Sequence, residues 1–214
     1  MRYRTRKSAG EALAAALVGR VGPNAVVVGL PRGGLPVAAP VARRLGATLD
    51  VRVVRKIGLP WAPEVALGAV ASTGDTVWNA PLEPEVPAPE RERLRQAAWA
   101  AAQEREAYIR ALLPPTVLTG RPVVVVDDGV ATGMTMRAAL ACVRREHPAR
   151  LLVAAPVMAP GVPAELGRHA DEVVALAVPA GFTAVGAHYD DFPQLTDAEV
   201  RAVLASWQPG STAG

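Results

Sequence analysis

Cysteine is almost absent from this 214-residue chain, since Cys142 is the only one. A single thiol cannot build a disulfide framework or a cysteine-based zinc site. The three histidines, His147, His169 and His188, show none of the HxxxH or HExxH spacings that bring imidazoles to one metal ion. We therefore interpret Cys142 as a small buried side chain of a helix and expect no zinc centre.

Aromatic residues and long apolar runs are also scarce. Aromatics make up 4% of the chain, and no zinc finger, DNA-binding helix pair or aromatic RNA-stacking platform is recognisable. No apolar run reaches the ~18 residues that a membrane helix needs. The basic start followed by apolar residues 12–18 is faintly like a signal peptide, but a short helix capped by Ser8 and Glu11 explains it better. We expect a cytoplasmic protein that binds neither membrane nor nucleic acid.

Among the basic side chains, arginine greatly outnumbers lysine. Lysine occurs only at Lys7 and Lys56, so arginine supplies the other 21 of the 23 basic side chains. Arginine recognises phosphate through a planar, bidentate fork. The formal net charge of +3 and pI of about 9.5 fit an anionic small ligand or a weak nucleic-acid footprint, and do not choose between them.

Short, Val-rich runs separated by helical stretches dominate the chain. Runs that are apolar without alternation are typical of parallel strands covered on both faces. We predict strands over residues 25–30, 48–55, 122–127, 151–157 and 172–178, and helices over 36–45, 90–113, 135–146 and 196–206. This order predicts an α/β fold with a parallel sheet and helices on both faces, in a single domain over 1–214 with a core of about 20–178.

Several segments do not fit this alternation of strands and helices. Residues 67–72 and 76–79 predict a hairpin, and the proline-rich stretch 80–89 predicts an exposed linker, so that 66–89 forms a candidate lid. Residues 179–208, with the N-terminal segment, are expected to form a small hood. Pro40 predicts a late start or a kink in its helix. The tail 209–214 is expected to be disordered.

The run that follows the strand at 122–127 indicates an anion site. The strand leads into two carboxylates, Asp127 and Asp128, then into a loop and a helix. Free backbone N–H groups at such a helix start bind phosphate, and two threonine hydroxyls add donors. The Walker spacing and its lysine are absent. The loop and helix start comprise Gly129, Val130, Ala131, Thr132, Gly133, Met134 and Thr135.

The two carboxylates restrict the ligand, because they repel a bare phosphate at close range. A ribose 5-phosphate satisfies both features, with its phosphate in the loop and its 2- and 3-hydroxyls on the acids. The competing interpretation is an aspartate helix cap followed by a tight turn. We favour the ligand site because the acids, glycines and threonines occur together in one run.

A second strand end, at residues 26–34, carries Arg32, Gly33 and Gly34. The glycines allow close approach of the backbone to a ligand, and Arg32 adds a fork of donors. The predicted strand 48–55 ends in Arg55 and Lys56, which adds two cations on the same edge of the sheet. Taken alone, these features fit a plain β-turn and a solvated strand end equally well.

Together these residues resemble the type I phosphoribosyltransferase family over roughly residues 20–195. Residues 123–135 match its phosphoribosyl pyrophosphate (PRPP) signature, and residues 30–34 are similar to its pyrophosphate loop, which often holds a non-proline cis peptide. Arg55 and Lys56 are similar to the basic pair of adenine- and orotate-type members. The overall pattern is most similar to a bacterial group whose base specificity is unassigned.

Two features of the resemblance point to different acceptor bases. Residues 182–186, with Tyr189 following, look like the base-binding hood of hypoxanthine-type members, so Phe182 and Tyr189 are the expected base-binding residues, and we expect at least one ring to line the pocket. The alternative is that both rings fill a small local core under the C-terminal helix. Hypoxanthine-type members, however, place an acid/base aspartate where this chain has Ala131. We therefore rank hypoxanthine and guanine below other bases.

The resemblance implies transfer of a phosphoribosyl group from PRPP to a nitrogenous base, with Mg²⁺, in a homodimer. Asp127 and Asp128 would hold the ribose hydroxyls, with indirect contact to the metal, while Arg32, Arg55 and Lys56 would neutralise pyrophosphate. A regulator that binds PRPP without turnover, with a nucleic-acid partner, is the alternative. A dinucleotide-dependent oxidoreductase is a third idea, and the GxGxxG fingerprint is missing.

Overall fold

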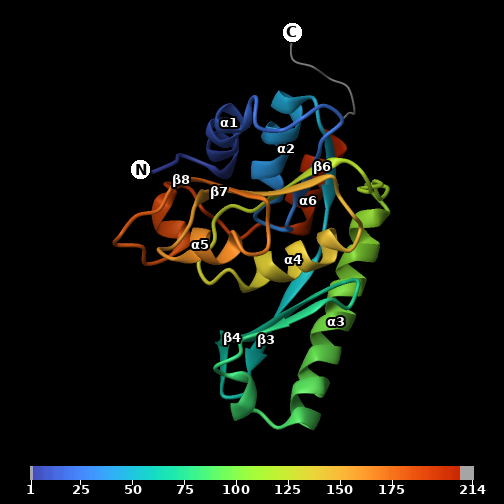
Figure 1. The fold of residues 1–214 in the computed structure, drawn as a ribbon, viewed down its shortest axis with the longest axis vertical. Helices are drawn as coiled ribbons and strands as arrows, with labels where there is room; N and C mark the ends of the chain where they lie inside the picture. The colour runs from blue at the N-terminus through green and yellow to red at the C-terminus, as the bar shows by residue number, and fades with distance from the viewer. Residues whose placement is uncertain (1, 208–214) are drawn as a thin grey trace.

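A parallel five-stranded sheet forms the centre of the computed structural model, which describes residues 2–207 (Figure 1). Its strand order is β2-β1-β6-β7-β8, and every pairing is parallel. The predicted α/β architecture is confirmed, while the predicted disordered tail at 209–214 lies outside the described residues. The strands are β1 (Val26–Gly29), β2 (Thr48–Val51), β6 (Pro122–Val126), β7 (Arg150–Val157) and β8 (Glu172–Ala177).

Helices cover both faces of this sheet, as the apolar strands require. On one face, α1 (Arg6–Leu17) and α2 (Leu35–Leu45) pack on one set of alternating strand residues. On the other, α4 (Met134–Arg144) and α5 (Val162–Leu166) cover the opposite set. Figure 1 shows the two layers above and below the sheet. Cys142 is buried on α4, as expected.

The predicted start of α1 was wrong, whereas the predicted helix 36–45 matches α2 closely. Helix α1 begins at Arg6, because Thr5 caps it and exchanges hydrogen bonds with Ser8 in a reciprocal box. The cap therefore lies three residues before the predicted one. Helix α2 begins at Leu35 and continues through the buried Pro40, so the proline does not delay its start.

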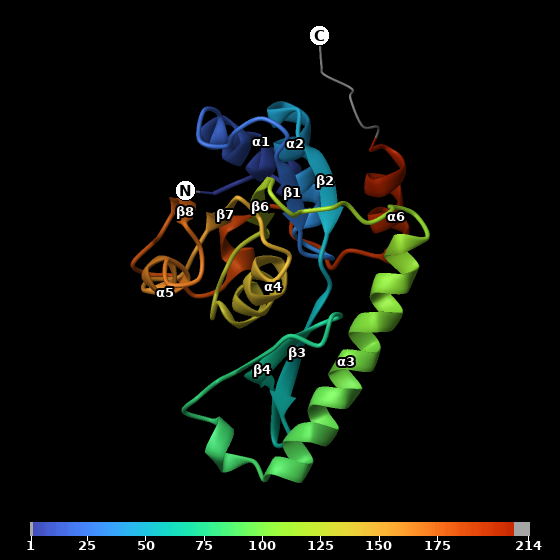
Figure 2. The same ribbon diagram turned by 45° about the vertical axis from the view of Figure 1, so that its right-hand side comes forward.

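A protruding unit extends from the core, built from an antiparallel sheet and a long helix (Figure 2). Helix α3 packs along β3 and β4, and the turn at η1 leads into it. The predicted hairpin is present, but it gains a third strand, β3, of which the sequence analysis assigned only the first two residues to a strand of the main sheet. The elements are β3 (Val54–Leu59), β4 (Ala62–Ala71), β5 (Thr76–Trp78), η1 (Glu83–Glu85) and α3 (Ala88–Arg110).

The predicted strand 48–55 is therefore split. Asp50 is fully buried and pairs with Arg52 at 2.6 Å and with Arg110 of α3 at 2.5 Å. Buried charges require such partners, and these lie where the chain leaves the main sheet after Val51. The chain then pairs with β4 instead, in the protruding unit.

Most of the stretch 80–89 is exposed, as predicted, but it contains the short helix η1 and one buried side chain. Its Val86 is 1% exposed and packs in a cluster with Leu59 and Leu67 of the small sheet. Partly buried residues of α3, among them Trp99, complete this cluster. The protruding unit thus has an apolar centre of its own and begins at β3, well before the predicted lid boundary.

The C-terminal part lies against the N-terminal segment. Tyr3 forms a parallel bridge with Tyr189, just after the short helix η2 (Val185–His188). Helix α6 (Asp197–Ala205) is capped by Thr196 and Glu199, as predicted. Within residues 2–207, none of the helices combines the length and apolar composition needed to cross a bilayer.

Candidate active site at the carboxyl edge of the sheet

The loop between β6 and α4 presents a row of unpaired backbone donors. Val130 N donates to Val157 O, which ties the loop to the next strand. Among the described residues, the amides of 131–136 donate to no atom. Gly133 has φ of +75° at the helix start, a conformation that favours glycine. Helix starts whose backbone amides are left without acceptors are the arrangement that binds anions in other proteins.

The two acids precede this loop and lie in a desolvated setting. The Asp128 side chain is 13% exposed, and its backbone N donates to Asp127 Oδ1 at 2.9 Å. Burial raises the pKa of Asp127 well above its usual range, and the nearby Asp128 charge adds to this effect. Burial also raises the pKa of Asp128, which the hydrogen bond and charge of Arg6 oppose.

Arg6 is a site residue that the sequence analysis missed. Its Nε donates to Asp128 Oδ2 at 2.7 Å, and its side chain is 10% exposed. Its Nη1 donates to Pro193 O, and its guanidinium lies 3.7 Å from the Phe192 ring centroid. The residue is 122 positions away from Asp128 in the chain, so no local pattern reveals the contact.

The two glycines of the β1–α2 loop lie close to Asp128 and to the end of β6. A Cβ on Gly33 would overlap the Asp128 carboxylate, and one on Gly34 would come within 2.7 Å of Val126 O. The peptide between Pro31 and Arg32 is cis. The structure thus joins the two predicted strand ends into one site.

Arg55 and Lys56 do not end a strand of the main sheet, contrary to the sequence prediction. Both lie within β3, where neighbouring side chains point to opposite faces. Arg55 lines a cavity of about 170 Å³ with Arg32. Lys56 lines a separate cavity of about 430 Å³ together with Thr132. The strand therefore delivers one cation toward each of the two loops.

The hood aromatics are placed differently from one another. Tyr189 is 2% exposed, packs against the rings of Tyr3 and Phe192, and donates to Asp128 O at 2.5 Å. Its ring faces are thus occupied, contrary to the expectation that it stacks on a base. Phe182 is half-buried and stacks on His188, with ring centroids 5.6 Å apart.

Only two carboxylates converge here, and within residues 2–207 no group of three His, Cys, Asp or Glu side chains could hold a metal. Magnesium is commonly held by one or two carboxylates together with substrate phosphates and water. The hard oxygen donors of Asp127 and Asp128 fit a Mg²⁺ ion that arrives with a phosphorylated substrate.

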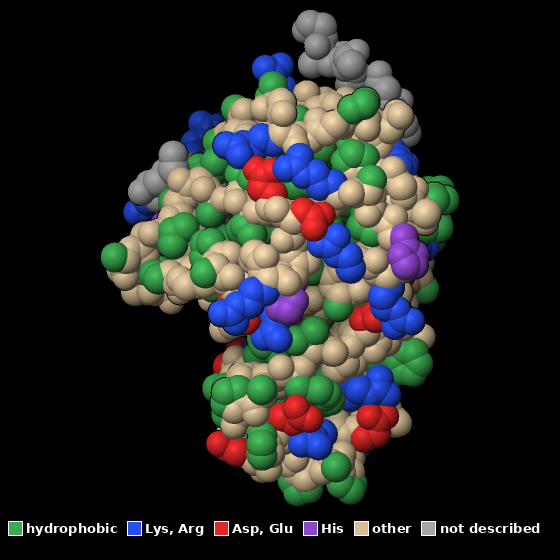
Figure 3. Space-filling view, in the orientation of Figure 1, with side chains coloured by type: hydrophobic (Ala, Val, Ile, Leu, Met, Phe, Trp, Pro, Cys, Tyr) green, Lys and Arg blue, Asp and Glu red, His purple; other side chains and the backbone are tan. Residues whose placement is uncertain are grey.

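Basic side chains do not form a continuous surface on the face shown in Figure 3, where described Lys and Arg residues are interspersed with acidic ones. A groove that tracks a nucleic-acid backbone requires clustered positive charge.

The strand ends of this parallel sheet carry paired acids, a helix start with unpaired amides and a glycine loop, which is the combination that the resemblance to phosphoribosyltransferases predicts. The sequence profile of the phosphoribosyl transferase domain matches residues 4–177. The chain belongs to this family, which confirms the resemblance.

Relatives agree with this assignment. A Mycobacterium tuberculosis H37Rv protein, Rv0571c, is 42% identical over 206 residues, and its name assigns it provisionally to the phosphoribosyl transferases. The match covers 93% of this chain and 45% of that protein, so the chain spans about half the length of this curated relative.

Solved structures share the fold. The structure of TT1426 from Thermus thermophilus has a TM-score of 0.82 and 47% identity, covering 97% of this chain and 99% of that one. A purine phosphoribosyltransferase from Pyrococcus horikoshii has a TM-score of 0.50 and 19% identity, covering 89% and 92%. The second likeness shows the fold alone.

Proposed function

We propose that the chain transfers the 5-phosphoribosyl group from PRPP–Mg²⁺ to a nitrogenous base and releases pyrophosphate. The observation that carries this proposal is the β6–α4 loop, where unpaired amides of residues 131–136 directly follow two carboxylates. A phosphate on the amides and ribose hydroxyls on the acids would use both the donors and the acceptors of this segment.

The chemistry at C1 of the ribose depends on charge and position. The bond to pyrophosphate breaks as the base nitrogen forms its bond, so positive charge develops on the ribose ring. Asp127 and Asp128 stabilise that charge electrostatically and orient the sugar through its hydroxyls. Mg²⁺, when bound, neutralises negative charge on the pyrophosphate oxygens.

Cations on the other side of the site receive the leaving group. Arg32 in the β1–α2 loop and Arg55 in β3 face one cavity, where both can bind pyrophosphate oxygens. Lys56 approaches from the opposite face of β3 through the cavity that it shares with Thr132. The protruding unit, which carries Arg55 and Lys56, acts as the lid that excludes water.

The ion pair between Arg6 and Asp128 favours a second candidate, a module that binds PRPP without turnover. The pair already neutralises one of the two acids. In such a sensor, the acid would orient the ribose hydroxyls but contribute less to stabilising charge on the ring.

Calorimetric titration of PRPP with Mg²⁺, followed by pyrophosphate release with a panel of bases, separates these functions. We expect saturable binding and release of pyrophosphate with at least one base. Binding without release from any base supports the sensor, and no binding of PRPP–Mg²⁺ contradicts both proposals.

A further inference from the structure

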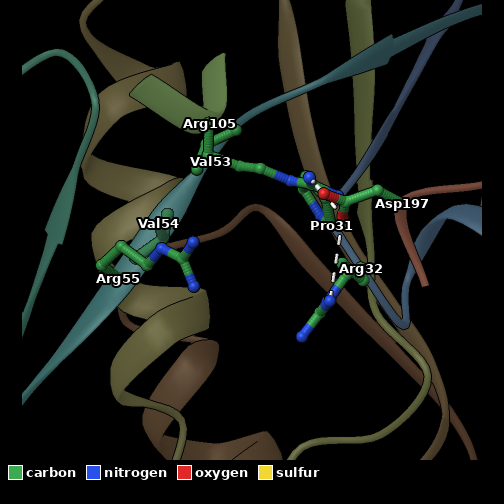
Figure 4. A pocket seen from close by; sticks show the side chains of 7 residues that line it. All are labelled: Pro31, Arg32, Val53, Val54, Arg55, Arg105 and Asp197. Carbon is green, nitrogen blue, oxygen red and sulfur yellow. Dashed lines mark hydrogen bonds and ion pairs between the residues drawn. The ribbon is translucent and has the colours of Figure 1, made fainter. Parts of the chain in front are cut away.

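The cavity beside the β1–α2 loop contains more positive charge than the family resemblance assigns to it. Arg32 and Arg55 line it from the core loop and from β3, and Arg105 enters from α3 (Figure 4). Its volume of about 170 Å³ is far above the ~10–15 Å³ that admits one water molecule. One carboxylate, Asp197 at the start of α6, also lines it.

Asp197 lies between two of these arginines. Its Oδ1 is 2.6 Å from Arg105 Nη1 and 3.8 Å from Arg32 Nη1 (Figure 4). The side chain of Asp197 is 56% exposed, whereas that of Arg105 is 11% exposed. The carboxylate therefore has free access to solvent, while the guanidinium that it neutralises is held in place.

The arginines are not fully satisfied by this single carboxylate. Nη2 of Arg105 is buried, and no atom of the described residues accepts a hydrogen bond from it. The Arg55 side chain has neither an ion pair nor a hydrogen bond among these residues. Buried donors normally find partners, so the unpaired Nη2 of Arg105 and the exposed, unpaired side chain of Arg55 leave donors at this cavity for a multi-oxygen anion.

We propose that Arg105 completes an anion site with Arg32 and Arg55, and that Asp197 is an internal competitor which an incoming diphosphate displaces. This inference rests on the proposed function for the identity of the anion. A diphosphate offers several oxygens in place of one carboxylate oxygen, so it can contact all three guanidinium groups. Binding thereby connects α3 of the protruding unit to the core loop.

Competition by Asp197 makes a distinctive prediction, because removing a negative charge from the cavity should tighten anion binding. Inorganic pyrophosphate is titrated calorimetrically at constant ionic strength into the wild type, Asp197→Asn and Arg105→Gln. We expect Asp197→Asn to tighten binding about fivefold or more and Arg105→Gln to weaken it about tenfold, as for loss of a charge-assisted hydrogen bond. When it is added to Arg105→Gln, the Asp197→Asn substitution should tighten pyrophosphate binding by a smaller factor than it does in the wild type.

Matched controls separate this effect from changes in helix stability or overall charge. Glu199→Gln removes an acid from the same turn of α6, and Arg93→Gln removes an exposed arginine from α3 that pairs with Glu90. Neither residue lines the cavity, so both should leave pyrophosphate affinity near the wild-type value. Arg105→Lys, which keeps the charge, should bind with intermediate affinity if Arg105→Gln fails to fold.

The outcomes distinguish this inference from the proposed function. Unchanged or weaker pyrophosphate binding in Asp197→Asn overturns the role of Asp197, and unchanged binding in both Arg105 variants overturns the role of Arg105. If PRPP–Mg²⁺ still binds the wild type in either case, the proposed function stands without this inference. If the expected pyrophosphate pattern appears but PRPP–Mg²⁺ does not bind, the anion site stands and the proposed function fails.

Discussion

The β6–α4 loop and the arginine cavity are built in opposite ways. The loop is one continuous run of sequence, and its donors are backbone amides whose directions follow from the start of α4. The cavity takes Arg32, Arg55, Arg105 and Asp197 from four separate elements. A local backbone site is thus encoded in a motif, whereas a side-chain site depends on tertiary packing.

The loop and the cavity should therefore differ in how they tolerate substitutions. Backbone amides persist through most substitutions, provided that the loop keeps its conformation. The sensitive positions around the loop should therefore be those where backbone and acid approach closely. In the cavity, by contrast, each arginine can be removed singly and the remaining cations still attract anions.

The largest effect is expected from Gly33→Ala. The added Cβ would overlap Oδ2 of Asp128, so either the β1–α2 loop or the acid must move. A displacement of about 1 Å in a site can reduce rate about 100-fold, and we expect a loss of at least that size in pyrophosphate release. The matched control is Gly22→Ala, whose Cβ would meet only the Pro122 ring, at 3.6 Å. Equal activity of the two variants would show that the β1–α2 loop can shift to accommodate the added Cβ without a loss of rate.

Asp128→Asn should weaken PRPP–Mg²⁺ binding about 10- to 150-fold. This corresponds to about 1.5–3 kcal/mol for a charge-assisted hydrogen bond to a ribose hydroxyl. The structure also predicts a loss of stability, because the substitution leaves the guanidinium of Arg6 buried without its counter-ion. Calorimetry and thermal unfolding measure the two effects separately.

The double variant Arg6→Gln/Asp128→Asn tests this separation. Removing both charges should restore much of the lost stability, since no unpaired buried charge remains, while PRPP–Mg²⁺ affinity stays low. Full recovery of affinity in the double variant would mean that Asp128 acts only through Arg6 and makes no contact with the ribose.

Sequence reasoning succeeded where neighbours in the chain are also neighbours in space. It predicted all five strands of the main sheet, and it identified the acids and loop from one run of residues. It failed at Asp50 and Arg52, whose buried ion pairs split an apparently continuous strand and moved Arg55 and Lys56 into the protruding unit.

Long-range pairings were equally inaccessible to the sequence analysis. Arg6 and Asp128 meet because α1 packs over the sheet, and neither position carries a local signal of that contact. Tyr189 was read as a base-stacking residue, although its ring is buried against Tyr3. An aromatic in an irregular segment has the same sequence signature whether it faces a ligand or a small core.

Asp127→Asn should stabilise the fold at neutral pH. Burial raises the pKa of this carboxyl in the folded chain, so the folded state holds its proton to higher pH than the unfolded state. Stability is therefore lost as the pH rises from the unfolded pKa of about 4 through the folded pKa. We expect a melting temperature higher by a few degrees, on the order of 2–4 °C per kcal/mol.

The pH dependence identifies the cause of this gain. Below about pH 4 the wild-type carboxyl is protonated in both states, so the advantage of Asp127→Asn should disappear there. Thermal unfolding of the wild type and of Asp127→Asn at pH 7 and at about pH 3.5 measures this difference in stability. A gain of the same size at both pH values would point to packing instead of charge.

The smallest effect is expected at Phe182, the hood aromatic whose ring is not fully buried. Val185, in the same hood segment, lies so close to the acid loop that a Cβ on Gly129 would come within 2.5 Å of it. This places the hood beside the proposed ribose site. A ring there can stack on a flat heterocycle, an interaction of about 0.5–1.5 kcal/mol.

Phe182→Ala should therefore raise KM for the base roughly 2- to 12-fold, the same energy expressed as a ratio, and leave KM for PRPP nearly unchanged. The selectivity between substrates is the informative result, because a general disturbance of the hood would affect both. Phe192→Leu is the matched comparison, since that ring packs on Tyr189 and Arg6. Because Arg6 pairs with Asp128, loss of the Phe192 ring should raise KM for PRPP. Equal shifts of both KM values in Phe182→Ala, or fast turnover of hypoxanthine by the wild type despite Ala131, would contradict this assignment of the base-binding end.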